Sequence, residues 1–353
     1  MWPRNLCAGP LHFQESDRPM KRLIACSAVV NIAIAVLMLG GCPEPDTEPS
    51  LPVEETQPPA AADWPRTFTD ALGEEVTLQQ PPQRVVCLST GFTEAIFAMG
   101  AGDRLVGRVT FAQYPPEVLE VPSVGGMIDP SLEAIAELEP DLLLTERGTP
   151  QDVIESIRRA GVPVLAQDPK SVDEVLWCIR EIGRYLGVED DANALADQLE
   201  ARAEAATERG NAIASGEGRP SVLFVVSIEP VFVAGTGHFV DDMIDRAGAL
   251  NAATLMDETS QDQWPSLSLE AIVELDPDIV VIAMMLEEEL SEVGGVEAFA
   301  NRPGWSELPA VKEGRIYTIN PDWAVRAGPR LFDAMEQMVE IVESGLSGEP
   351  IDD

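Results

Sequence analysis

The chain has 353 residues, enough for about two domains with separate cores. Its 61 acidic and 23 basic residues give a formal net charge of -38, which argues against nucleic acid as a partner because the phosphates would be repelled. Two explanations of the acidity stay open: solubility in high salt or outside the cell, or a plain solvated surface encoded by an acidic, arginine-rich genome.

Residues 1–41 have the pattern of a leader with a lipoprotein signal peptide. We expect Met20 to be the working start, because a basic run at 20–22 precedes an apolar stretch at 23–38 that is short for a membrane-spanning anchor. Small residues then precede Cys42, as in the lipobox of bacterial lipoproteins. We therefore expect Cys42 to be lipidated and to hold the protein on the periplasmic or extracellular face of a membrane.

Residues 42–62 are rich in Pro, Glu and Ala without an apolar period, which predicts a disordered tether. From 63 to 188, after a hairpin at 66–78, apolar strands alternate with helices, so we expect an N-terminal lobe built on a mostly parallel sheet. Cys87 falls in an apolar strand and Cys178 on an amphipathic helix, and we expect both to be buried free thiols.

The strongest signal in the chain is a duplicated segment. SLEAIAELEPD at 131–141 and SLEAIVELDPD at 268–278 match at nine of eleven positions with an offset of 137. In each copy a serine can cap a helix, an acid follows in the first turn, and a buried strand comes after Pro-Asp. A duplicated helix–strand unit predicts two similar α/β lobes with a ligand cleft between them.

Between the two copies, residues 171–214 contain no run typical of a strand. We expect one helix near 171–187 and then a long, alanine-rich linking helix at 189–215. The C-terminal lobe is expected at 219–345. The fold class is therefore α/β, with two Rossmann-like lobes joined by a long backbone helix.

Catalytic and metal-binding motifs are missing from the sequence. After removal of the leader one histidine remains, His238, so we expect no bare transition-metal site. The chain has no G-x-S-x-G, no P-loop and no dinucleotide fingerprint, and it offers no candidate base or nucleophile. We expect a protein that is not an enzyme and needs no cofactor.

Aromatic and charged side chains in predicted loops are the better functional signal. They follow the carboxyl ends of strands, where open α/β sheets bind ligands. We take the following as candidate ligand residues: Phe111, Tyr114, Phe232, Trp264, Asp322, Trp323 and Arg326.

From Asp63 to about Val342 the sequence resembles the periplasmic iron-siderophore/cobalamin binding proteins of ABC importers, the class with a helical backbone between lobes. The resemblance rests on stretches such as VGGMIDPSLEAIAELEPDLLL and RPGWSELPAVKEGRIYTI. The segments YPPEV, SIEPVFVAGTG, QWPSLSLEAI and DWAVRAGPRLFDAMEQM are most similar to the cobalamin-binding members.

The resemblance implies roles for individual residues. Glu133 and Glu270 match the two glutamates at the lobe tips that dock onto arginines of the permease. Phe232, Trp264, Asp322 and Arg326 match ligand positions. The chain departs from the family in the first lobe, where cobalamin binders have tryptophans and this chain has Gly125 and Glu146, and Phe111 stands in place of a tyrosine.

Together these observations predict a lipid-anchored receptor, expected to be monomeric. It would capture a metal chelate, a corrinoid above all, and deliver it to an ABC importer made of a permease dimer with its ATPase subunits. A ferric-siderophore or haem receptor of the same class is the first alternative. An extracellular chelatase-like enzyme with this fold and a surface interaction protein are alternatives of other classes.

Overall fold

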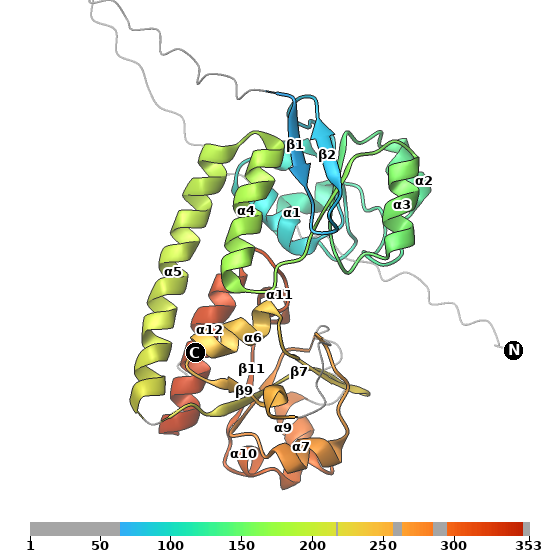
Figure 1. The fold of residues 1–353 in the computed structure, drawn as a ribbon. Helices are drawn as coiled ribbons and strands as arrows, with labels where there is room; N and C mark the ends of the chain where they lie inside the picture. The colour runs from blue at the N-terminus through green and yellow to red at the C-terminus, as the bar shows by residue number, and fades with distance from the viewer. Residues whose placement is uncertain (1–63, 217, 257–262, 285–294, 349–353) are drawn as a thin grey trace, which may run out of the picture. The chain divides into compact units, whose positions relative to one another are not determined.

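The computed structural model describes residues 64–216, 218–256, 263–284 and 295–348. The expected leader, the lipidation site Cys42 and the tether at 42–62 lie outside these residues. All described residues belong to one compact unit, Pro59–Asp353. It contains two α/β lobes with parallel sheets and a long helix between them, so the predicted fold class is confirmed (Figure 1).

The N-terminal lobe is built on a four-stranded parallel sheet in the order β4-β3-β5-β6. An antiparallel hairpin of two further strands precedes it. The elements of this lobe are β1 (Arg66–Thr69), β2 (Glu75–Leu78), β3 (Val85–Cys87), α1 (Thr90–Ala98), β4 (Leu105–Arg108), α2 (Leu132–Glu137), β5 (Leu142–Glu146), α3 (Gln151–Arg159) and β6 (Val164–Gln167), with 3-10 turns at Gly102–Arg104 and Pro116–Glu120. The central strands β3 and β5 contain the apolar runs 85–87 and 142–144, because helices cover both faces of the sheet.

Two helices follow the first lobe, α4 (Val172–Leu186) and α5 (Glu189–Gly216). Ser171 caps the start of α4, and Gly187 ends it with a φ of 68°, which a residue with a Cβ would adopt only with strain. A Cβ added at Gly183 would lie 2.1 Å from that of Ala192, so α4 and α5 pack at close range. None of the helices in the described ranges is long and apolar enough to cross a membrane.

The C-terminal lobe has a sheet in the order β11-β10-β7-β8, in which β9 also pairs with β7. Neighbouring strands of this sheet run parallel to each other, except that β8 runs antiparallel to β7. The elements are β7 (Ser221–Ile228), β8 (Val231–Val233), α6 (Phe239–Arg246), β9 (Leu250–Asn251), α7 (Leu269–Leu275), β10 (Ile279–Ile282), α9 (Gly295–Ala300), α10 (Pro309–Lys312), β11 (Ile316–Thr318), α11 (Pro321–Ala324) and α12 (Leu331–Ser347), with 3-10 turns at Ala252–Leu255 and Trp305–Glu307.

The duplicated segment adopts the same local structure in both lobes. The hydroxyl of Ser131 accepts a hydrogen bond from the amide of Ala134 at 3.1 Å, and that of Ser268 accepts one from Ala271 at 3.2 Å. Both predicted caps are therefore present.

The ends of the two copies also correspond. Glu139 and Asp276, which are 137 residues apart, have φ values of 44° and 43°, the only positive values among described residues other than glycine. The terminal aspartates, Asp141 and Asp278, then accept the amides of Arg84 at 2.9 Å and Ser221 at 2.8 Å, beside the first strand of each sheet.

One apolar core runs through both lobes. It includes Phe92 of α1, Ile182 of α4, Phe224 of β7 and Met335 of α12, each no more than 1% exposed. The helix α5 contributes its small side chains to this core and lies alongside α4 and α12, as Figure 1 shows. Separate, smaller cores fill the opposite face of each sheet. Cys87 and Cys178 are buried and free, as predicted.

Candidate functional site

The two lobes meet directly where α1 approaches the segment between α11 and α12. A Cβ added at Gly91 would lie 2.5 Å from the carbonyl carbon of Ala327 and 2.8 Å from the amide nitrogen of Gly328. No side chain fits between two backbones at this separation. One turn further along α1, Glu94 receives two hydrogen bonds from Arg330, at 2.6 and 2.9 Å. We call these five residues the joint.

The ion pair of the joint is largely removed from water. The Glu94 side chain is 4% exposed and that of Arg330 is 16% exposed. Burial raises the pKa of Glu94, and the hydrogen bonds from Arg330 oppose that rise. The guanidinium of Arg330 also lies over the ring of Tyr114, 4.3 Å from its centre, so it contacts the first lobe twice.

Arg326 lies four residues before Arg330, and Asp322 lies four before Arg326. Asn320 caps α11 by accepting the amide of Asp322 at 2.9 Å, which places Asp322 in the first turn. The carboxylate of Asp322 then pairs with Arg326 at 2.6 Å. Burial lowers the pKa of Arg326, whose side chain is 14% exposed, and the negative charge of Asp322 opposes that lowering.

On the first lobe, Ser89 and Glu146 lie at the carboxyl ends of neighbouring strands. The hydroxyl of Ser89 accepts the amide of Phe92 at 3.1 Å and donates to the Glu146 carboxylate. Burial raises the pKa of Glu146, and among the described residues the cation that opposes this rise is Arg326 of the second lobe. Charges of the two lobes therefore act on each other across the region between Glu146 and Arg326.

Two of the predicted aromatic residues lie together in the second lobe. The amide of Leu267 donates to Val231 at 3.0 Å and that of Val233 donates to Pro265 at 3.1 Å, so β8 pairs with the segment after residue 263. Phe232 lies opposite Ser266 in this pairing. Side chains alternate along an extended chain, so Trp264, two residues before Ser266, projects from the same face of this strand pairing as Phe232. The sequence-based expectation of a loop at Phe232 was wrong, because a three-residue strand is too short to show a period.

His238 packs beside this aromatic face. Its ring meets that of Trp264 edge to face, with centres 4.8 Å apart. It is 7% exposed, and its Nδ1 accepts the amide of Val240 at the start of α6. Burial lowers the pKa of His238 to about 3, helped by the positive charge of Lys170. His238 is therefore neutral at physiological pH.

The other predicted site residues are placed as follows. Trp323 is half-buried against the large core, and Phe111 is 56% exposed after β4. Glu133 and Glu270 are exposed in the first turns of α2 and α7. The structure thus brings Tyr114, Asp322 and Arg326 to the joint, and Phe232 to Trp264. No group of three or more potential metal ligands occurs within the described ranges.

Sequence reasoning missed the roles of Glu94 and Arg330. The signal was available in part, because Glu94 is the one charged residue in the helix TGFTEAIFA, most of which is buried. A lone acid in such a helix requires a partner. The identity of that partner, 236 residues away, could not be read from the sequence.

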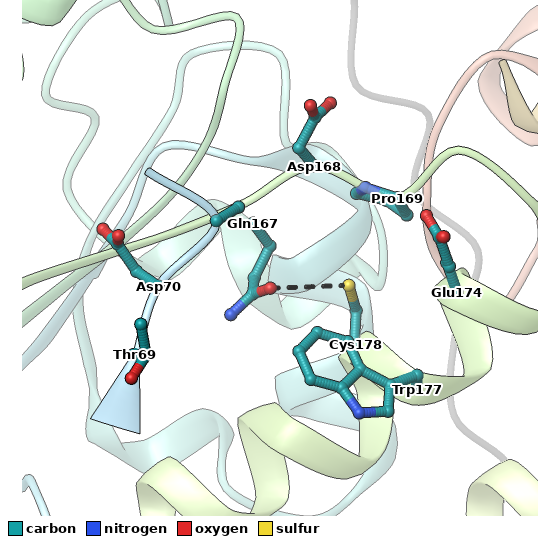
Figure 2. Close-up of a pocket in the computed structure, with 9 residues that line it drawn as sticks. Thr69, Asp70, Gln167, Asp168, Pro169, Glu174, Trp177 and Cys178 are labelled. Carbon is teal, nitrogen blue, oxygen red and sulfur yellow. Dashed lines mark hydrogen bonds between the residues drawn. The ribbon is translucent and has the colours of Figure 1, made fainter. Parts of the chain in front are cut away.

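A separate cavity of about 310 Å³ opens on the first lobe (Figure 2). Figure 2 shows Gln167, the last residue of β6, facing Trp177 and Cys178 of α4, and the Cys178 sulfur is 3.9 Å from the side-chain amide oxygen of Gln167. None of the seven predicted ligand residues lines this cavity. Its volume is at the low end of sites for drug-sized ligands, about 300–1,000 Å³, so we do not assign the chelate to it.

The comparisons with known proteins agree on one family. Residues 85–323 match the model of the periplasmic binding protein family. An uncharacterized ABC transporter substrate-binding lipoprotein of Bacillus subtilis, YvrC, is 34% identical over 88% of this chain and 95% of its own. A cobalamin-binding protein of Halobacterium salinarum is 27% identical over 88% of this chain and 83% of its own. The apo structure of the periplasmic heme-binding protein RhuT from Roseiflexus has a TM-score of 0.65 at 31% identity, covering 74% of this chain and 98% of that one.

Proposed function

We propose that this chain, which belongs to the periplasmic binding protein family and is a substrate-binding protein of an ABC transporter, captures a corrinoid. The protein acts at the extracellular face of a membrane. The Halobacterium relative is named as a cobalamin-binding protein and the Roseiflexus protein as a heme-binding protein, which supports a role in capture and not in catalysis. We infer that the chain has no resident cofactor and that the chelate is its cargo.

We choose a corrinoid over haem because Arg326 and Arg330 are each already paired with a carboxylate. Haem bears two carboxylates, which proteins bind well with free arginines. Here Arg326 is paired with Asp322 and Arg330 with Glu94, both at 2.6 Å. With Glu146 included, these five side chains carry two positive and three negative charges. A corrinoid with neutral peripheral amides fits this balance better than a dianion does.

Aromatic side chains supply the remaining recognition. Phe232 and Trp264 share a face, and Tyr114 lies at the joint with 47% of its surface exposed. Rings of this kind bury much of a large flat ligand, and a few polar groups fix its orientation.

Titration of the purified protein with cyanocobalamin, haemin and a ferric siderophore tests the proposal. Binding of cyanocobalamin at least about tenfold tighter than haemin, a difference of about 1.4 kcal/mol, is the expected result. Preference for haemin would favour the haem receptor, for which the likeness to RhuT is the supporting observation. Failure to bind any of the three would contradict the proposal as a whole.

The partner and the anchor are parts of the same proposal. We infer that Glu133 and Glu270 dock onto arginines of the permease, because the duplicated segment gives each lobe an exposed acid in an equivalent first turn. We also infer that Cys42 carries the lipid, as the word lipoprotein in the name of the Bacillus relative supports.

A further inference from the structure

The cavity of the first lobe lies between the turn after β1, the end of β6 and one face of α4 (Figure 2). Its volume of about 310 Å³ equals that of about ten water molecules, at about 30 Å³ each in the liquid. A small organic molecule fits such a space, whereas a macrocyclic chelate does not. The cavity therefore calls for an occupant different from the cargo of the receptor.

Gln167 supplies a buried polar group that points into this cavity. The residue is 2% exposed, and its side-chain N–H donates to the hydroxyl of Tyr185, which fixes the orientation of the amide. The amide oxygen is left with the Cys178 thiol, a weak donor, at 3.9 Å. Figure 2 shows the side chain extending into the space between Thr69 and Trp177. A buried acceptor without a strong donor costs free energy, so we expect the occupant to donate a hydrogen bond to it.

Three carboxylates line the cavity, and one of them keeps an oxygen for a ligand. The oxygens of Asp70 are taken by an arginine at 2.7 Å and by three backbone amides. Those of Asp168 pair with Lys170 at 2.6 Å and with Arg147 at 3.0 Å. Glu174 accepts the backbone amide of Lys170 through one oxygen, at 2.6 Å, and no ion pair among the described residues includes it. The charge that the lining leaves uncompensated is therefore negative.

Trp177 adds an aromatic wall beside that charge. Glu174, Trp177 and Cys178 are three and four residues apart, so they share one face of α4. The Trp177 side chain is 48% exposed, which leaves part of its ring for contact with a ligand. A tryptophan ring attracts a cation over its face more strongly than the other aromatic rings do. An aromatic ring next to an uncompensated carboxylate suits an organic cation.

We propose that this cavity is a second binding site and that it takes a small primary ammonium compound with an apolar body. The ammonium group donates to the side-chain oxygen of Gln167 and to the carboxylate of Glu174. The apolar body covers the Trp177 ring and Pro169, which also lines the cavity. Ligands with carboxylate or phosphate groups are rejected, because the described lining residues include no lysine or arginine. This inference does not depend on the proposed function, since no chelate enters the cavity.

Calorimetric titration with 2-phenylethylammonium, and with 2-phenylethanol as its neutral counterpart, tests the proposal. The wild type should bind the ammonium with a Kd of about 1 mM or tighter, at least about tenfold more tightly than the alcohol. Glu174→Gln keeps an acceptor for the Lys170 amide but removes the charge, so it should weaken ammonium binding about tenfold and leave alcohol binding unchanged. Trp177→Leu should weaken binding of both compounds, since both pack on the ring. Glu137→Gln, at an exposed position of α2, is the control for loss of one negative charge and should change neither affinity.

Cyanocobalamin provides the second measurement. Its affinity should be the same in the wild type, in both cavity variants, and in the presence of saturating ammonium. A change in that affinity would make the cavity part of the chelate site and overturn the inference. Equal binding of the ammonium and the alcohol would contradict the cationic class of ligand. Ammonium binding that survives both substitutions, or a wild-type Kd weaker than about 10 mM, would show that the cavity takes no such compound.

Discussion

The ion pair of the joint offers the sharpest test of how the lobes are held together. Glu94→Gln preserves the size of the side chain and leaves Arg330 without its carboxylate. Removal of one partner of a buried pair costs about 3–5 kcal/mol. Arg330 is 16% exposed and keeps its contact with the Tyr114 ring, so we expect a loss at the lower end, about 3 kcal/mol.

In a protein of this size about 1 kcal/mol shifts the melting temperature by 2–4 °C, so the variant should melt about 6–12 °C lower. Glu137→Gln, exposed on α2, is the control for loss of a negative charge and should melt as the wild type does. Calorimetry of Glu94→Gln, Arg330→Met and the double variant completes a thermodynamic cycle, with an expected coupling of about 2 kcal/mol. A coupling below about 0.5 kcal/mol would refute the reasoning, because the two side chains would then contribute independently.

Three further predictions concern acid stability, ligand affinity and transport. Burial lowers the pKa of His238 to about 3, so between about pH 6.5 and pH 3 the imidazole is protonated in the unfolded chain and neutral in the folded one. The free energy of unfolding should therefore fall by up to about 1.4 kcal/mol per pH unit as the pH falls through this range. His238→Asn, which can still cap α6, should flatten that loss in acid melts, and an unchanged slope would contradict the assignment. Trp264→Ala and Arg326→Ala should each weaken corrinoid binding by about 2 kcal/mol, and unchanged affinity in both would move the site elsewhere. Glu133→Ala with Glu270→Ala should slow uptake in vesicles holding the cognate importer while ligand affinity stays constant; uptake at the wild-type rate would make the repeat purely structural.

Local structure was the part of this protein that the sequence predicts well. Ser131 and Ser268 cap their helices as the repeat indicates, since a serine before an apolar helix satisfies amides two or three residues away. The same holds for α4, which starts after Ser171 and ends at Gly187. Such features depend on residues within one helical turn, and they are visible in a single sequence.

Long-range pairing was the part that could not be predicted. Glu94 and Arg330 form the joint because two segments far apart in the chain approach until Gly91 meets the backbone at Ala327. Nothing in either segment specifies the other. Phe232 was expected in a loop for a related reason, since β8 exists through its pairing with β7 and with the segment after residue 263.

The apolar core that runs through both lobes has a consequence for how occupancy is sensed. A hinge that closed widely would have to break this core and pull α5 away from α4 or α12. We therefore expect empty and loaded receptors to offer a permease nearly the same pair of docking surfaces. Empty receptors would then compete with loaded ones for the importer, and the ratio of receptor to importer would itself limit the rate of uptake.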